Sequence, residues 1–179
     1  LNAVLNLWAS TGNVERAWKL LQRSLEEGVN NDLYSYNAIL LGYVNMGQAQ
    51  QAEDLLFEMC RTDGLQPTIV SFNLVLSGWA RSNVDKKYAA ERAEQLLVSL
   101  MMLNGDKNVA GPDAGADDES SALSRSGKQS LQPNLLTLNT VLSACARAGD
   151  ASRCERLLKE MHDLYESGRL DEPPDSVSF

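Results

Sequence analysis

An asparagine recurs at the same place in four similar apolar segments of this 179-residue chain: LNAVLNLWA, YSYNAILLGYV, VSFNLVLSGWA and LTLNTVLSACA. These residues are Asn2, Asn37, Asn73 and Asn139. Asparagine is a mediocre helix former, because its short amide competes for backbone hydrogen bonds and favours caps and turns. One such residue needs no explanation. Four in register indicate a chain built from repeated units.

Other positions keep the same register. Asn2 and Asn37 are 35 residues apart, and Asn37 and Asn73 are 36 apart. After each first apolar pattern comes a turn position, then a small residue that lets paired helices approach, then two leucines. The turn position holds Gly12, Gly47 and Gly149, with Asn83 in the third unit, and the small-residue position holds Ala17, Ala52, Ala93 and Cys154.

Each unit reads as two helices. In the second unit, apolar residues recur at helical spacing from Leu33 to Tyr43 and form one stripe. Gly47 then serves as the turn, since glycine enters the left-handed region freely, and a second helix runs from about Gln48 to Arg61. One hairpin cannot bury its stripe alone. We therefore expect an all-α fold, a right-handed α-solenoid of about four helix-turn-helix units.

The predicted units, the first incomplete at its start, are residues 1–32, 33–68, 69–134 and 135–175, with 176–179 opening another. The third is longer than the second, with about five extra residues in the turn around SNVDKKYAA. It also holds a stretch over about 104–130 that is rich in Gly, Ser and Asp and has no aromatic residue. Such a stretch buries too little apolar surface to offset its ordering entropy, so we predict a disordered insertion. A chain that starts at Leu1 and ends in SVSF is expected to be a fragment.

Composition argues against several classes of function. With 24 acidic and 16 basic residues the net charge is −8, which disfavours binding to nucleic acid by charge alone. Three cysteines and one histidine lack the spacing of a disulfide framework or a metal site. No apolar run approaches the roughly 18 residues of a membrane span. We expect no cofactor, no metal, no membrane partner, no small-molecule substrate and no catalytic activity in these residues.

Several side chains have ordinary structural interpretations. The tryptophans at helical spacing are expected to pack in the core, and the acidic residues of the second helices are expected to face away from any binding surface. These residues are Trp8, Trp18 and Trp79, and Glu53, Asp54 and Glu58. A short polar residue precedes each first helix, as expected of an N-cap: Asp32, Thr68, Asn134 and Asp175. The helix asparagines have a structural alternative too, in which each amide bonds the backbone of a neighbouring unit.

Together these features resemble the pentatricopeptide repeat family. The likeness rests on the YN or FN dipeptide, the glycine turn, the A-x-x-L-L/F-x-E-M run and the closing G-x-x-P-D/N/T, as in LFEMCRTDGLQPT. It covers nearly the whole chain outside the insertion, and the related tetratricopeptide signature is absent. The departures are Asn83 for Gly, Cys154 for Ala and Asn31 for Pro. The resemblance implies binding of single-stranded RNA in mitochondria or chloroplasts, one base per repeat.

The resemblance also implies which residues read the bases. The pairs are Asn2 with Asp32, Asn37 with Thr68, Asn73 with Asn134, and Asn139 with Asp175. A carboxylate accepts but cannot donate, so it suits the N3–H of uracil. An Asn–Asn pair serves either pyrimidine with cytosine favoured, and the Thr68 pair only leans to pyrimidine. The predicted site is 5′-U-Y-C/U-U. Bases would stack between Tyr34, Val70, Leu136 and Val177, and phosphates would contact Arg81 and Arg147, which as surface arginines could equally be solvated.

Three hypotheses follow. The first is an RNA-binding module that acts in organellar RNA processing, stability, editing or translation, with RNA-processing proteins as further partners. The second is a helical-repeat scaffold for protein–protein interaction, which gives no reason for the repeated asparagine. The third is the repeat region of an RNA-processing nuclease whose catalytic domain lies outside this chain.

Overall fold

The computed structural model describes residues 2–27, 32–62, 65–105, 131–168 and 170, and within them all regular secondary structure is helical. The helices come in four pairs, each joined by a short turn. They are α1 (Asn2–Ser10), α2 (Val14–Glu26), α3 (Leu33–Asn45), α4 (Ala49–Arg61), α5 (Ile69–Arg81), α6 (Lys86–Gly105), α7 (Leu135–Ala148) and α8 (Ala151–Glu166).

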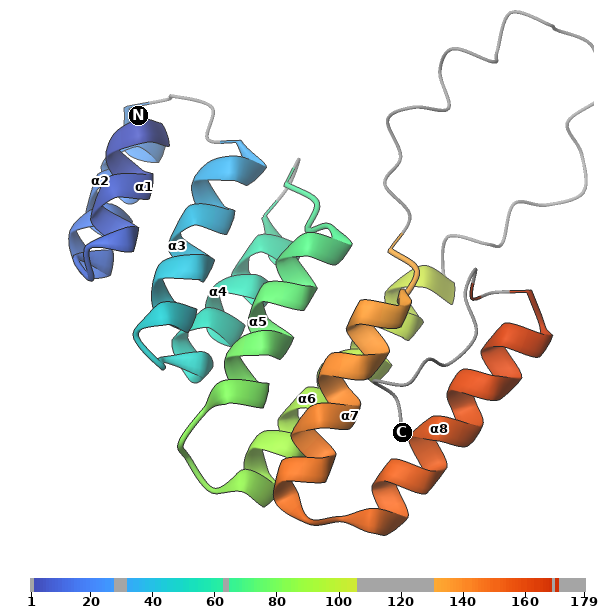
Figure 1. Cartoon of the computed structure of the whole chain (residues 1–179). Coiled ribbons are helices and arrows are strands. Elements are labelled where there is room, and N and C mark those ends of the chain that lie inside the picture. The colour runs from blue at the N-terminus through green and yellow to red at the C-terminus, as the bar shows by residue number, and fades with distance from the viewer. Residues whose placement is uncertain (1, 28–31, 63–64, 106–130, 169, 171–179) are drawn as a thin grey trace, which may run out of the picture.

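The helices are arranged as a solenoid (Figure 1). A front row consists of α1, α3, α5 and α7, which contact one another in that order. In the back row, α2, α4 and α6 each pack against the front-row helix of their own pair and that of the next, while α8 packs on α7. The all-α solenoid expected from the sequence is confirmed. Front-row helices run the same way, so their N-terminal ends share one edge, called the N-terminal edge below (Figure 1).

Glycines allow neighbouring front-row helices to lie close together. A Cβ atom on Gly42 of α3 would lie 3.0 Å from Ala9 Cβ of α1, and one on Gly78 of α5 would lie 2.9 Å from Val44 Cγ2 of α3. Both distances are shorter than a carbon–carbon contact allows. Ala144 holds the equivalent position in α7 and is buried. Small residues here therefore set the spacing at which successive units present their side chains.

The turns of three pairs contain glycine in the left-handed region, with φ of 80° at Gly12 and 72° at both Gly47 and Gly149. In the third pair the connection, residues 82–85, is only one residue longer than residues 46–48 of the second pair. Helix α6 starts at Lys86, well before its small residue Ala93. The prediction that the extra residues lengthen the turn is wrong. They extend α6 at its N-terminus, because KKYAAERAE consists largely of good helix formers.

Helix α6 continues to Gly105, two residues into the stretch assigned to the insertion. The rest of that stretch lies outside the described residues.

Glu53 does not lie on the surface where the sequence placed it. Its side chain, on α4, is 1% exposed. Oε2 accepts a hydrogen bond from Trp79 Nε1 on α5 at 2.7 Å, and the carboxylate also pairs with the Arg92 guanidinium on α6. The expectation for Glu53 is wrong because two neighbouring helices supply donors that satisfy a buried charge. Asp54 and Glu58 are exposed, as expected.

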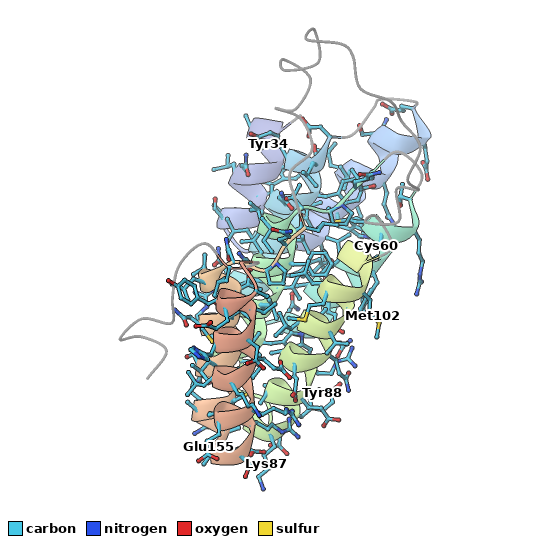
Figure 2. All side chains as sticks on the ribbon, turned by 90° about the vertical axis from the view of Figure 1, so that its right-hand side faces the viewer. Tyr34, Cys60, Lys87, Tyr88, Met102 and Glu155 are labelled. Carbon is cyan, nitrogen blue, oxygen red and sulfur yellow. The ribbon has the colours of Figure 1, made fainter. Side chains whose placement is uncertain are left out.

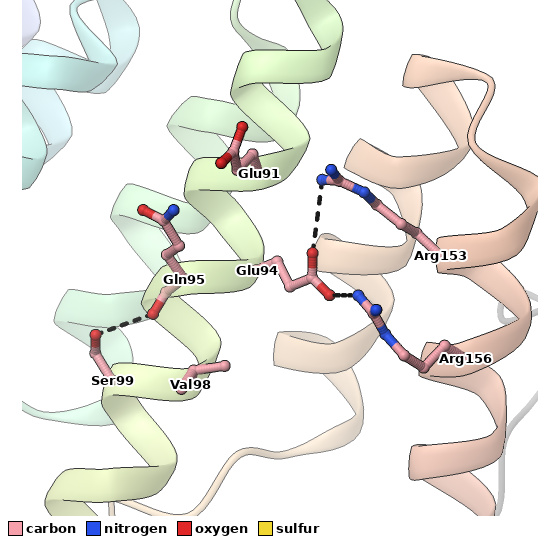
Figure 3. A pocket seen from close by; sticks show the side chains of 7 residues that line it. All are labelled: Glu91, Glu94, Gln95, Val98, Ser99, Arg153 and Arg156. Carbon is pink, nitrogen blue, oxygen red and sulfur yellow. Dashed lines mark hydrogen bonds and ion pairs between the residues drawn. The ribbon is translucent and has the colours of Figure 1, made fainter.

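The next junction in the back row is held differently. Glu94 on α6 faces two arginines of α8 (Figure 3). Its Oε2 lies 3.6 Å from Arg153 Nη1, and its Oε1 pairs with Arg156 Nη2. The Arg156 side chain is 56% exposed, so this ion pair lies at the solvent-facing surface of the solenoid.

Candidate nucleic-acid interface

Three of the four predicted cap residues, Asp32, Thr68 and Asn134, lie at the N-terminal edge, each directly before a front-row helix. Asp32 Oδ1 accepts from the Ser35 backbone N–H at 3.0 Å, and Asn134 Oδ1 accepts from the Thr137 N–H at 2.9 Å. Thr68 has the extended conformation of an N-cap residue before α5. Asp32 and Asn134 therefore have the capping role expected from the sequence, and in each of them Oδ1 is the acceptor.

Asn37 reaches the next unit through a serine hydroxyl. Its Oδ1 accepts from Ser71 Oγ of α5 at 2.8 Å. The same Ser71 Oγ accepts from the Thr68 backbone N–H at 3.3 Å. One hydroxyl thus joins the two members of the predicted pair Asn37–Thr68, which are 31 positions apart in the sequence.

The following junction repeats the arrangement with a threonine. Thr137 Oγ1 lies 2.8 Å from Asn73 Oδ1 and 2.7 Å from Asn134 Oδ1. It also accepts from the Asn134 backbone N–H at 3.3 Å. The pair Asn73–Asn134 is therefore bridged as well. In both junctions the asparagine bonds a side chain of the next unit, rather than the backbone that the structural alternative invoked.

Two of the four predicted pairs are described only in part. Asn2 lies in α1, but its side chain is outside the described residues, and so are Asp175 and Val177. Asn139 on α7 is half-buried and has an interaction partner within the protein. The geometry of reading pairs is therefore available at the α3–α5 and α5–α7 junctions.

The predicted stacking residues form an apolar row at the same edge. Tyr34, Val70 and Leu136 each occupy the second position of a front-row helix, and they are 76%, 51% and 63% exposed. Figure 2 shows Tyr34 at one end of the molecule, far from Lys87 and Glu155. Large apolar side chains at equivalent exposed positions indicate a contact surface rather than core packing.

The two predicted phosphate contacts lie near the other end of the front-row helices. Arg81 is exposed, and its Nε donates to the Ser77 carbonyl oxygen at 3.3 Å. Arg147 is exposed too, but its guanidinium donates to the Ala80 carbonyl oxygen near the end of α5. Arg147 thus also links α7 to α5, a role that the sequence did not indicate.

Two of the three cysteines, Cys145 and Cys154, have thiols that are harder to ionise than a free cysteine. Burial raises the pKa of the Cys145 thiol to about 11, and burial raises the pKa of Cys154 as well. Both therefore stay protonated at neutral pH, whereas the thiolate is the reactive form. In the described part of the chain, no group of three His, Cys, Asp or Glu side chains is placed to hold a metal ion. The helices described there are also too short or too polar to cross a membrane.

The bridging hydroxyls were not predicted from the sequence. Ser35, Ser71 and Thr137 each stand two residues before a recurring asparagine, so the repeat register contained the signal. It was hidden because Ser and Thr in a first helical turn are explained by local capping alone.

Sequence models of known protein families match two regions of the chain, residues 1–80 and 136–165. The family model described as "pentatricopeptide repeat domain" matches residues 19–80. The family model described as "PPR repeat" matches residues 1–29 and 136–165. Together the matches cover residues 1–80 and 136–165, more than half of the chain.

Similar proteins of Arabidopsis thaliana carry the same description. A chloroplastic pentatricopeptide repeat-containing protein is 35% identical over 75 residues, or 42% of this chain and 10% of that protein. Another pentatricopeptide repeat-containing protein, whose description names no organelle, is 26% identical over 170 residues, or 94% of this chain and 24% of that protein. A mitochondrial pentatricopeptide repeat-containing protein is 28% identical over 77 residues, which are 43% of this chain and 9% of that protein. The chain thus spans between about a tenth and a quarter of these relatives.

Among solved structures, the pentatricopeptide repeat protein PPR10 from maize superposes with a TM-score of 0.68 at 18% identity. The match covers 99% of this chain and 20% of that protein. At this identity it shows the shared helical-solenoid fold.

Proposed function

The chain belongs to the pentatricopeptide repeat family, and on that premise we propose that it binds single-stranded RNA in a sequence-specific manner. Membership of the family supports RNA binding of this general type. The finer proposal is one base per repeat at the N-terminal edge, with a site of the form 5′-U-Y-C/U-U. The observation that carries it is the asparagine–hydroxyl–cap arrangement, repeated at two successive junctions beside an exposed apolar side chain.

Each junction offers the two elements needed to hold one base. Tyr34, Val70 and Leu136 provide surfaces on which bases stack, with the aromatic ring the strongest of the three. An amide and a cap residue beside them supply donors and acceptors for a base edge, as in other helical-repeat readers of RNA. An acidic cap suits uracil, and the Asn134 cap favours cytosine.

The charge of the chain shapes the mode of binding. A net charge of −8 makes non-specific attraction to phosphates weak. Affinity then depends on stacking and on base contacts. The back-row side chains Asp54 and Glu58 are exposed, which keeps acidic groups on the other row of helices.

We place this binding in an organelle, because relatives are described as chloroplastic or mitochondrial. The mechanism is passive: the bound protein occupies a single-stranded site and blocks nucleases or RNA structure, or recruits other RNA-processing proteins. Either action would affect transcript processing, stability, editing or translation, and neither needs a catalytic group in these residues.

Selection from randomised short RNA tests the proposal. The full chain should enrich pyrimidine-rich sequences, and Asn37→Ala, Asn73→Ala and Asn139→Ala should each relax one base position, with roughly tenfold weaker discrimination there. Asn45→Ala is the matched control, because Asn45 is exposed at the far end of α3. Enrichment without pyrimidine preference, or equal behaviour of the control and the three variants, would refute base reading.

A further inference from the structure

Three front-row helices, α3, α5 and α7, bury a hydroxyl at their third position. Ser35, Ser71 and Thr137 are 1%, 0% and 0% exposed. Burying a hydroxyl has a free-energy cost unless it is hydrogen-bonded. At the two fully described junctions it is bonded to both members of a proposed reading pair, so its placement concerns more than the cap of its own helix.

The direction of the bonds at Ser71 can be assigned from its single proton. Ser71 Oγ accepts the Thr68 backbone N–H, so the proton of the hydroxyl points to Asn37 Oδ1. The amide of Asn37 is thereby oriented with its oxygen toward α5. Its NH2 group makes no hydrogen bond with the described residues and is not buried, so it remains as a donor at the surface.

At Thr137 the same proton faces two acceptors. Asn73 Oδ1 and Asn134 Oδ1 lie at nearly equal distances from Oγ1, 2.8 and 2.7 Å. One proton cannot satisfy both fully, so the Asn73 amide is held less firmly than the Asn37 amide. The two junctions therefore differ in how strictly they orient the asparagine.

We propose that the third-position hydroxyl is a positioning residue that sets the base specificity of the preceding repeat. Holding the amide oxygen directs the two N–H donors of the asparagine toward the bound base. The O2 oxygen that uracil and cytosine share is the acceptor that fits, and an amide turned the other way would present an oxygen to it. This inference rests on the proposed RNA binding and names residues that control it.

The test compares Ser71→Ala with Ser71→Thr. Removing the hydroxyl should lower the preference for pyrimidine at the second base about fivefold to tenfold and leave the other positions unchanged, and threonine should restore it. Ser77→Ala is the matched control, since in the described part of the chain that hydroxyl bonds only the Leu74 carbonyl within α5. At the third base, Thr137→Val should act like Ser71→Ala with a smaller effect, and Thr137→Ser should restore the preference.

A second readout needs no RNA. Side-chain amide relaxation in 15N NMR should show Asn37 ordered in the wild type and in Ser71→Thr, but mobile in Ser71→Ala. If Ser71→Ala keeps both the order and the pyrimidine preference while Asn37→Ala loses the preference, the positioning role is wrong and base reading stands. If the wild type has no preference, base reading fails, and the NMR result alone decides whether Ser71 orients Asn37. If Ser71→Ala does not fold, the Thr137 variants provide the same comparison.

Discussion

The junctions that join α3 to α5 and α5 to α7 are alike at the N-terminal edge and different in the back row. At the edge, both have an asparagine oxygen bonded to a third-position hydroxyl that accepts from the cap residue. In the back row, the first is held by the buried Glu53 and the second by the partly exposed Glu94. The back-row helices are thus held together by different ion pairs at the two junctions. The N-terminal edge uses the same asparagine–hydroxyl–cap arrangement at both.

This difference between the back row and the N-terminal edge indicates that the two surfaces have different roles: one stacks helices, and the other presents side chains to a ligand. Helices that only need to stack can use whichever ion pairs or apolar contacts fit locally. A surface that meets a regularly spaced ligand must present the same groups at the same interval. The N-terminal edge has this second character, and the proposed ligand, a nucleotide chain, is itself a polymer of repeated units.

The largest expected effect is on stability, through the buried ion pair of Glu53 in the back row. Glu53→Ala leaves Trp79 Nε1 without its acceptor and leaves Arg92, which is partly exposed, with the Gln95 side chain alone, so the free energy of unfolding should fall by about 3 kcal/mol. Urea unfolding followed by tryptophan fluorescence measures it. Glu58→Ala, on the exposed face of the same helix, is the control and should change stability little. A loss below about 1 kcal/mol for Glu53→Ala would mean that the two back-row ion pairs are equivalent.

The next effect concerns the one chemical difference between the two reading pairs, Thr68 against Asn134. Asn134→Asp keeps a good N-cap but replaces a donor by an acceptor, so the third base should change from C or U to U. We expect about a tenfold gain in U over C, measured with RNAs that differ at that base. The reciprocal change, Asp32→Asn, should relax the first base in the same assay. If C remains favoured in Asn134→Asp, the cap residue does not read the base.

The sequence predicted the helices, the left-handed turn glycines and the N-caps because these depend on residues close together in the chain. Gly47 and Asp32 carry their signals within a few positions of the turn or helix that they define. The burial of Glu53 was not predictable in this way. Its partners Trp79 and Arg92 are 26 and 39 residues away, and only the stacking of three helices brings them together.

The candidate site shows the same limit at a finer level. The repeat register was enough to pair Asn37 with Thr68, but not to reveal that Ser71 stands between them. Ser71 is an ordinary capping-box residue within its own helix, and its second bond crosses to another unit. The start of α6 was misplaced for a different reason: a gap in the register was interpreted as a loop although its residues favour helix.

A smaller effect is expected from the exposed back-row pair. Glu94→Ala removes contacts to Arg153 and Arg156 that are partly screened by solvent, so the free energy of unfolding should fall by at most about 1 kcal/mol. Measured in high salt, this loss should shrink further, since added ions screen the same charges. A loss as large as that of Glu53→Ala would show that burial does not distinguish the two junctions. Glu91→Ala, at an exposed position on α6, controls for the change in net charge.

The smallest effect tests whether the likeness of the two junctions extends to the phosphates. Among the described residues, Arg81 bonds only its own helix, whereas Arg147 donates to the Ala80 carbonyl oxygen of α5. If both contact phosphate, each Arg→Ala change should weaken all RNA sequences equally and lower the salt dependence of log K by about 0.7. Arg147→Ala should in addition reduce stability, because the end of α5 loses a donor. Arg61→Ala, in the back row, should alter neither quantity. If the salt dependence is unchanged in Arg81→Ala but lower in Arg147→Ala, Arg81 is solvated and does not contact phosphate. The two junctions would then be equivalent in their base contacts but not in their phosphate contacts.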